Sequence, residues 1–224
     1  PTVIALSKGV HMSITALIDH TLLAPDATVQ HIRSLYREAV NHDFYSPTRV
    51  RLAAVELAGY APRVCAVAGF LSDAHPSETR AIEAKTAISD GTNEVDIVIN
   101  VGAVKDSDGG PVESDKPTVV DAAGKTIVKV LFENSELTDK KNVRACQAVE
   151  RYGAYFVKTS TGTSEHGATA HAVSLMRRTV GDRPGVKTSD GIRTPEDVAT
   201  MLGAGVTRTS ASAGVSVLAD EEAL

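Results

Sequence analysis

The chain has 224 residues, of which 42% are hydrophobic and 23% charged, a composition that suits one sizeable folded core and argues against disorder. Its net charge of −5, its 4% aromatic residues and its lack of tryptophan argue against a nucleic-acid binder, which needs a basic surface or a stacking platform. No apolar run reaches the ~18 residues of a membrane span, and no signal-peptide pattern opens the sequence. We therefore expect a water-soluble, cytoplasmic protein.

Short runs rich in valine and isoleucine alternate with longer amphipathic segments. In chain order, this pattern predicts strand–helix units at 17–42, 44–58, 63–89, 94–124, 126–152, 155–180, 185–202 and 206–218. The strands lack a clean alternation, which is typical of a parallel sheet buried on both faces. The best-defined helices are predicted over 28–42, 77–89, 138–152, 168–180 and 194–202, with Thr138 as an N-cap and Gly203 as a stop.

Eight such units predict an α/β protein with a closed (β/α)8 fold, the TIM barrel. A doubly wound open sheet is the alternative, although no G-x-G-x-x-G follows the first strand. We expect one domain over residues 1–224 with a short N-terminal extension of about 1–13, and a polar surface loop over 105–116. The strands at 44–45 and 207–210 carry the weakest signals.

Four charged residues interrupt the apolar strand runs: Asp96, Lys129, Lys158 and Lys187. Buried charges are costly unless they are paired. Lys129 alone could form a structural ion pair, with Glu133 as one candidate partner, but several lysines on neighbouring strands are harder to explain as architecture.

Lysines held close together in a low-dielectric site lower one another's pKa, so that one becomes a free amine near neutral pH. A free amine attacks a carbonyl carbon and forms a Schiff base, while a second lysine and an aspartate can move protons. The sixth and seventh strands are neighbours in a barrel, which predicts that Lys158 and Lys187 are adjacent. The pattern favours carbonyl chemistry through a covalent imine.

Four segments resemble the deoxyribose-phosphate aldolase family: IDHTLL at 18–23, EVDIVINVG at 94–102, FVKTSTG at 156–162 and GIRT at 191–194. The resemblance runs from about Ile14 to Val217. It implies a class I aldolase on a TIM barrel that interconverts 2-deoxy-D-ribose 5-phosphate with D-glyceraldehyde 3-phosphate and acetaldehyde. It implies no metal or organic cofactor, and a possible homodimer without nucleic-acid or membrane partners.

The resemblance also implies roles for individual residues. The Schiff-base lysine falls on Lys158, the second active-site lysine on Lys187 and the proton-relay aspartate on Asp96. The residues implied to bind substrate are Asp19, Thr21, Lys129, Thr159, Gly162, Gly191 and Ser212.

This sequence departs from the family pattern where a phosphate would bind. Asp190 and Ser210 replace glycines, and Glu165 adds a further carboxylate. A carboxylate repels a phosphate dianion, so one hypothesis is that selectivity has moved toward unphosphorylated aldehydes. Alternatively, Asp190 turns to solvent or pairs with Arg193. Two further readings stay open: another imine-forming barrel enzyme, such as a transaldolase-like or keto-acid aldolase, and a degenerate barrel with a binding role.

Overall fold

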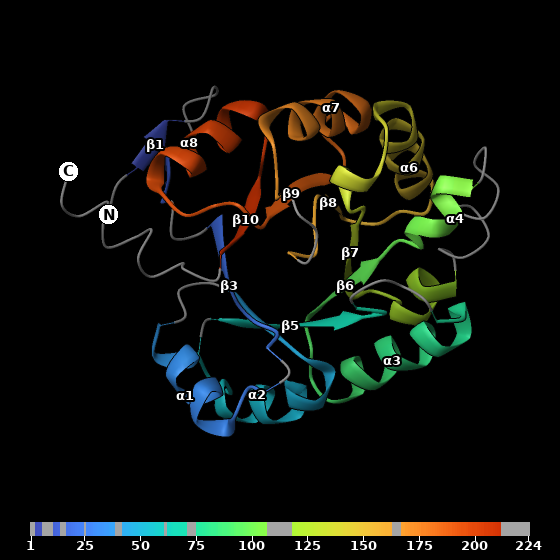
Figure 1. Ribbon diagram of the computed structural model, residues 1–224. Coiled ribbons are helices and arrows are strands. Elements are labelled where there is room, and N and C mark those ends of the chain that lie inside the picture. Colours follow the sequence, from blue (N-terminus) through green and yellow to red (C-terminus); the bar gives the residue numbers. More distant parts are fainter. Residues whose placement is uncertain are drawn as a thin grey trace.

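A closed barrel of eight parallel strands forms the centre of the molecule (Figure 1). The computed structural model describes residues 3–5, 11–13, 17–24, 26–38, 42–60, 62–70, 75–106, 118–162 and 167–211. The barrel strands are β3 (Ile18–Leu22), β4 (His42–Tyr45), β5 (Arg63–Ala68), β6 (Glu94–Val98), β7 (Ile127–Leu131), β8 (Phe156–Lys158), β9 (Gly185–Ser189) and β10 (Arg208–Ala211). Because β10 pairs with both β9 and β3, the open-sheet alternative is wrong and the TIM barrel is confirmed.

Helices surround the barrel on its outside (Figure 1). They are α1 (Val29–Glu38), α2 (Val50–Glu56), α3 (Ser77–Ser89), α4 (Val101–Asp106), α6 (Asp139–Arg151), α7 (Ala170–Val180) and α8 (Pro195–Ala204), with 3-10 turns η2 (Pro47–Arg49) and η3 (Asn134–Glu136). Two short strands, β1 (Val3–Ala5) and β2 (His11–Ser13), pair with each other in a separate antiparallel ribbon. Within the described residues, every helix is too short or too polar to cross a membrane.

Helix caps explain several of these boundaries. The Thr138 side chain accepts a hydrogen bond from the Lys141 amide, as an N-cap should. Thr194 and Asp197 form a complete capping box at the start of α8. The predicted stop at Gly203 is wrong: α8 continues to Ala204 and ends at Gly205, whose φ of 107° suits a residue without a Cβ.

The first predicted helix was too long. Residues 28–42 continue an apolar helical spacing, but α1 ends at Glu38 and His42 already belongs to β4. There His42 pairs with Asp19 of β3 and Arg63 of β5. Closing the barrel requires a strand at this point, and this long-range pairing overrides the local helical pattern.

Alternation along the strands separates an apolar outer face from a charged inner face. On β6, Val95 and Ile97 pack in the core beneath the helices, while Glu94 and Asp96 have the opposite parity. All five residues of β6 are buried. The strand is therefore buried on both faces as predicted, and its inward face carries the chemistry.

Candidate active site

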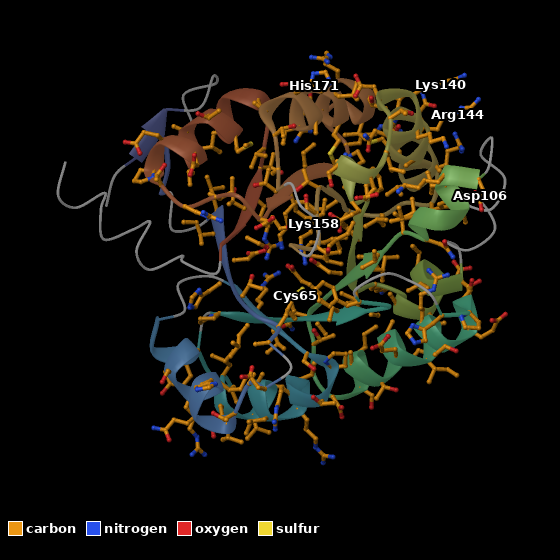
Figure 2. The ribbon with its side chains drawn as sticks, in the orientation of Figure 1. Cys65, Asp106, Lys140, Arg144, Lys158 and His171 are labelled. Atoms are coloured by element: carbon orange, nitrogen blue, oxygen red, sulfur yellow. The ribbon has the colours of Figure 1, made fainter. Side chains whose placement is uncertain are left out.

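The barrel register brings the charged strand residues to one place. Asp96 of β6 pairs with Lys129 of β7, and Lys158 of β8 pairs with Lys187 of β9. The adjacency predicted for these two lysines is confirmed. Figure 2 shows Lys158 inside the barrel, with Cys65 on the opposite side of the interior.

The Asp96 carboxylate lies among the side-chain nitrogens of three lysines. Oδ1 accepts from Lys129 Nζ at 2.8 Å, and Oδ2 accepts from Lys158 Nζ at 2.7 Å. Lys187 Nζ lies 3.8 Å from the same Oδ2. Asp96 is fully buried and Lys158 is 4% exposed, so Lys158 and Lys187 share one carboxylate oxygen in an environment with little water.

Further contacts close these groups into a ring. Lys129 Nζ lies 2.7 Å from Glu94, and Arg208 lies 2.8 Å from Glu94 and 2.7 Å from Asp19. Asp19 Oδ2 in turn accepts from Lys187 Nζ at 2.5 Å. We call this set the charge ring; in order around it, its members are Asp96, Lys129, Glu94, Arg208, Asp19 and Lys187. Lys158 joins the ring through Asp96.

The charge count of this cluster is uneven. Among the described side chains, the charge ring holds three carboxylates and three cations, so it is neutral by itself, and Lys158 adds a fourth cation. A buried surplus charge is unfavourable, and a cluster that carries one releases a proton readily. Burial lowers the pKa of Lys187 to about 7, with the nearby charges of Lys158 and Lys129 acting in the same direction against Asp19 and Asp96.

Asp96 and Lys129 keep their ordinary charge. Burial alone would raise the pKa of Asp96, but Lys129, Lys158 and Lys187 outweigh it and hold that pKa well below its usual range. Burial alone would lower the pKa of Lys129, but Asp96 and Glu94 outweigh it and raise that pKa. A carboxylate and an ammonium therefore persist beside an amine that titrates near neutral pH.

Cys65 lies against the same centre. Its Sγ accepts a hydrogen bond from Lys129 Nζ at 3.1 Å and lies 3.5 Å from Asp96 Oδ1. Burial, followed by the Asp96 charge, raises the pKa of the Cys65 thiol. The thiol therefore stays protonated and acts as a neutral neighbour of the charge ring.

The remaining predicted substrate-binding residues have mixed positions. Thr21 is half-buried and its hydroxyl donates to the Asp19 carbonyl at 3.4 Å. Thr159 is fully buried and its Oγ1 accepts from the Ser189 amide at 3.1 Å, which ties β8 to β9. Gly162 and Gly191 lie in the loops after these strands with φ values of 89° and 79°. Ser212 and Glu165 lie outside the described residues.

Asp190 adopts the left-handed backbone conformation at the end of β9, with a φ of 65°. A Cβ placed on Gly162 would meet its Cβ at 3.7 Å and its Cγ at 3.9 Å, so the Asp190 side chain lies beside the loop that follows β8. The ion pair considered with Arg193 is not found among the described residues, where the Arg193 amide donates to Asp197 instead.

Glu133 also has a positive φ, of 53°. Its Oε2 accepts from the Thr161 amide at 3.0 Å and from the Thr161 hydroxyl at 2.5 Å. The contacts described for Lys129 are with Glu94, Asp96 and Cys65. Glu133 therefore braces the loop after β8, and its pairing with Lys129 stays a prediction.

Sequence reasoning missed two members of the charge ring, Glu94 and Arg208. Both are charged residues within otherwise buried runs, the same signal that identified Asp96 and the lysines. Arg208 lies in the weakly predicted last strand, and Glu94 begins its strand, where a charge is easily assigned to the surface.

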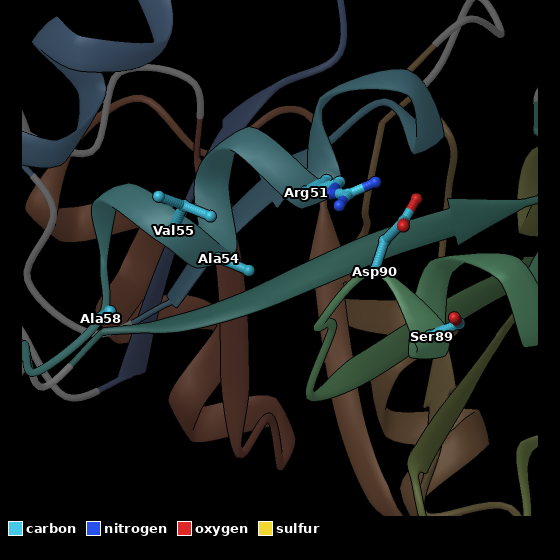
Figure 3. A pocket seen from close by; sticks show the side chains of 6 residues that line it. All are labelled: Arg51, Ala54, Val55, Ala58, Ser89 and Asp90. Atoms are coloured by element: carbon cyan, nitrogen blue, oxygen red, sulfur yellow. The ribbon is translucent and has the colours of Figure 1, made fainter.

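Two other features of the molecule do not belong to this centre. A hollow of about 510 Å³ lies between α2 and the end of α3 (Figure 3), lined by Arg51, Ala54, Val55, Ala58, Ser89 and Asp90. It belongs to the outer helical layer and contains none of the residues of the charge ring. In the described part of the chain, no three histidine, cysteine or acidic side chains are grouped so that they could hold a metal ion.

Comparison with known proteins gives a consistent assignment. No family model matches the chain. Deoxyribose-phosphate aldolase 1 of Cutibacterium acnes is 71% identical over 217 residues, which cover 95% of this chain and 100% of that protein. The deoxyribose-phosphate aldolase of Listeria welshimeri is 50% identical over 216 residues, covering 94% and 97% of the two chains.

Solved structures agree with these relatives. A protein from Coccidioides immitis, assigned to the deoxyribose-phosphate aldolases, superposes with a TM-score of 0.91 at 35% identity, covering 93% of this chain and 85% of that one. The deoxyribose phosphate aldolase of Aeropyrum pernix, described as a tetramer, gives 0.83 at 28% identity, with 93% and 91% covered. This chain belongs to the deoxyribose-phosphate aldolase family.

Proposed function

We propose that this protein is a class I aldolase that reversibly cleaves 2-deoxy-D-ribose 5-phosphate into D-glyceraldehyde 3-phosphate and acetaldehyde. The observation that carries the proposal is the shared Asp96 Oδ2, with Lys158 Nζ at 2.7 Å and Lys187 Nζ at 3.8 Å, inside the barrel of a member of this family. An amine that titrates near neutral pH beside a second lysine and a carboxylate meets the requirements of imine catalysis.

The first step requires Lys158 as a free amine. A proton on Lys158 Nζ can pass through Asp96 Oδ2 to Lys187, whose pKa of about 7 leaves that amine free to accept it in about half of the molecules at neutral pH. Lys158 Nζ then attacks the C1 aldehyde carbon of the open-chain sugar. The resulting carbinolamine loses its hydroxyl as water, with a proton from Lys187, and becomes an iminium ion.

The iminium then drives carbon–carbon cleavage. Acetaldehyde contains C1 and C2, so the bond that breaks is C2–C3, and its electron pair moves toward the positively charged nitrogen to form an enamine. The C3 hydroxyl loses its proton, through water, to the Lys187–Asp96 pair, and D-glyceraldehyde 3-phosphate leaves. Protonation of the enamine at C2 and hydrolysis of the imine release acetaldehyde and restore Lys158.

The charged interior suits this sequence of steps. The Lys158 nitrogen is positively charged as an ammonium and again as an iminium, and it is neutral as the free amine and as the enamine. Lys129 stays charged on the other carboxylate oxygen, so the Asp96 carboxylate faces at least one cation throughout. Its contacts are already in place before substrate binds, and such preorganised groups cost little reorganisation during the reaction.

The direct test measures acetaldehyde release from 2-deoxy-D-ribose 5-phosphate in an assay coupled to alcohol dehydrogenase and NADH. We expect turnover by the unmodified protein and none by Lys158→Ala, with circular dichroism showing that the variant is folded. Turnover by Lys158→Ala, or its absence in the folded unmodified protein, would contradict the proposal.

A second candidate keeps this chemistry but prefers unphosphorylated aldehydes. The Asp190 carboxylate beside Gly162 favours it, because TIM barrels commonly bind phosphate at the loops after their seventh and eighth strands and a carboxylate there repels a dianion. The ratio of kcat/KM for deoxyribose 5-phosphate to that for deoxyribose separates the two candidates. A ratio of many orders of magnitude would reject the second.

We further infer that the protein acts in the cytoplasm on small molecules and forms a homodimer. Light scattering on the purified protein tests the assembly. The tetramer described for the Aeropyrum pernix relative is the alternative outcome.

A further inference from the structure

Three serines follow the inward-facing basic residues of the last three barrel strands, on the side of the carboxyl ends of these strands. Lys158, Lys187 and Arg208 are followed two residues later by Ser160, Ser189 and Ser210. Because side chains alternate along a strand, Lys187 and Ser189 share a face of β9, and Arg208 and Ser210 share a face of β10. Ser210 also pairs in register with Ser189 and with the inward-facing Asp19. Ser160 follows the end of β8 and lies next to Ser189, whose hydroxyl donates to the Ser160 carbonyl. We call Ser160, Ser189 and Ser210 the serine layer.

Two of the three hydroxyls have no partner within the described protein. Ser160 is 1% exposed and Ser210 is 5% exposed, and the Oγ atom of each forms no hydrogen bond with any described protein atom. By contrast, Ser189 Oγ donates to the Ser160 carbonyl. Most buried side-chain polar groups have partners, and an exception asks for an explanation.

The position of these hydroxyls suggests the explanation. Two residues advance a strand by ~6.6 Å, which is roughly the reach from Lys158 Nζ through C1 to the C4 hydroxyl of an extended open-chain sugar. A sugar joined through C1 to Lys158 and extending toward the open end of the barrel would bring its hydroxyl-bearing carbons to the serine layer. A hydroxyl can both donate and accept, so a serine suits a substrate hydroxyl.

We propose that Ser160 and Ser210 bind the hydroxyl groups of the acceptor aldehyde. In the cleavage direction, this aldehyde is the substrate fragment that leaves first. This inference rests on the proposed aldolase function and deepens it, because it makes the two serines determinants of specificity for acceptors that are hydroxylated next to their carbonyl carbon. Ser210 stands where the family resemblance leads one to expect a glycine, so its hydroxyl is a contact that the family pattern would not supply.

The test runs the reaction in the synthetic direction, with acetaldehyde as donor and either D-glyceraldehyde or propanal as acceptor. Propanal lacks the hydroxyls, and neither acceptor carries a phosphate. We expect Ser160→Ala and Ser210→Ala each to lower kcat/KM for glyceraldehyde about threefold to tenfold, the range of one neutral hydrogen bond. The value for propanal should stay within about twofold. An equal fall for both acceptors, or no fall for glyceraldehyde, would overturn the inference.

Borohydride trapping with acetaldehyde alone distinguishes a failure of the proposed aldolase function from a failure of the proposed role of the serine layer. Both alanine variants should form the acetaldehyde adduct as the unmodified protein does, because acetaldehyde has no hydroxyl to bind. If the unmodified protein forms no adduct, the aldolase function fails and this inference falls with it. If all three proteins form the adduct but the acceptor preference is unchanged, only the role of the serine layer is wrong.

The thermal unfolding temperature, Tm, shows whether the hydroxyls of Ser160 and Ser210 have a structural role instead. Ser160→Ala and Ser210→Ala remove hydroxyls that bind no described protein group, so their Tm should equal or exceed that of the unmodified protein. Ser189→Ala is the matched control, and its Tm should fall because a buried hydrogen bond is lost. If Ser160→Ala and Ser210→Ala lower Tm as much as Ser189→Ala does, their hydroxyls are structural and the inference is refuted.

Discussion

Glu94 offers a way to change the charge of the active centre without touching either reacting amine. Its carboxylate contacts Lys129 and Arg208, and those cations in turn contact Asp96 and Asp19. Glu94→Gln keeps the shape of the side chain and removes one of the three described carboxylates of the charge ring. The surplus then rises from one cation to two.

The expected effect follows from the geometry of the ring. Glu94 lies across the ring from Lys187 and is separated from it by three ion pairs in series, so two unit charges ~8–10 Å apart at an effective dielectric constant of ~20 interact by about 2 kcal/mol. At about 1.4 kcal/mol per unit, this interaction corresponds to about 1–1.5 pKa units. Removing an anion disfavours the ammonium form of Lys187, so its pKa falls below the present value of about 7.

The assay is the pH dependence of kcat/KM. Activity requires a free amine, so the acidic limb of the profile should move to lower pH by one unit or more in Glu94→Gln. Breaking a buried ion pair also costs stability, about 3–5 kcal/mol, so Glu94→Asp serves as the conservative variant and should restore both stability and profile. Glu136→Gln is the surface control, since Glu136 is about half exposed and pairs only with Lys105 among described residues.

Arg208→Met makes the test directional. The substitution removes the cation that pairs with Glu94, and Asp19 then keeps only Lys187 of its two partners in the charge ring. The ammonium form of Lys187 is favoured, its pKa rises, and the acidic limb should move to higher pH. A purely structural role would lower activity in both variants without opposite shifts. An acidic limb that stays within 0.3 unit of the unmodified protein's, or that moves the same way in both variants, would refute the charge-balance reasoning.

Three further results are expected. Lys158→Met removes the surplus cation from a neutral ring, so its Tm should equal or exceed that of the unmodified protein in calorimetry; a fall of several degrees would count against the charge count. Asp190→Gly relieves a left-handed backbone, worth about 1 kcal/mol or about 2–4 °C for a domain of this size, and should raise kcat/KM more for deoxyribose 5-phosphate than for deoxyribose. Equal changes for both sugars would show that the carboxylate does not face the phosphate. Thr194→Ala breaks the capping box of α8 and should cost about 1 kcal/mol, seen as a lower denaturant midpoint, while an unchanged midpoint would show that the cap contributes nothing.

The fold was accessible from the sequence because its signals are periodic and local. Helix α3 has the predicted bounds, since a proline before Ser77 and a glycine after Asp90 mark them clearly, and strand β5 begins at Arg63, where its predicted unit begins. The boundary between α1 and β4 could not be predicted from the sequence. The pairing of His42 with Asp19 and Arg63 is a property of the closed barrel, and the local sequence carries no sign of it.

The site was accessible in part for a similar reason. A lysine in a valine-rich strand is conspicuous, and parallel strands necessarily bring their equivalent positions together. Which amine has the lowered pKa could not be read from spacing, because it depends on how deeply each amine is buried and on all the charges around it, including Asp19 from a distant part of the chain. The conformation of Asp190 was equally hidden, since its backbone contacts Gly167 and Ala168, which belong to a different loop of the barrel.

The central claim is that Lys158 forms the covalent imine. Incubation with acetaldehyde and sodium borohydride, followed by proteolysis and peptide mass mapping, tests it directly. The account predicts a single reduced two-carbon adduct on Lys158, formed at a rate that rises as the pH passes through about 7, in line with the pKa of Lys187. An adduct on Lys187 or Lys129 instead, or no adduct in the folded protein, would contradict it.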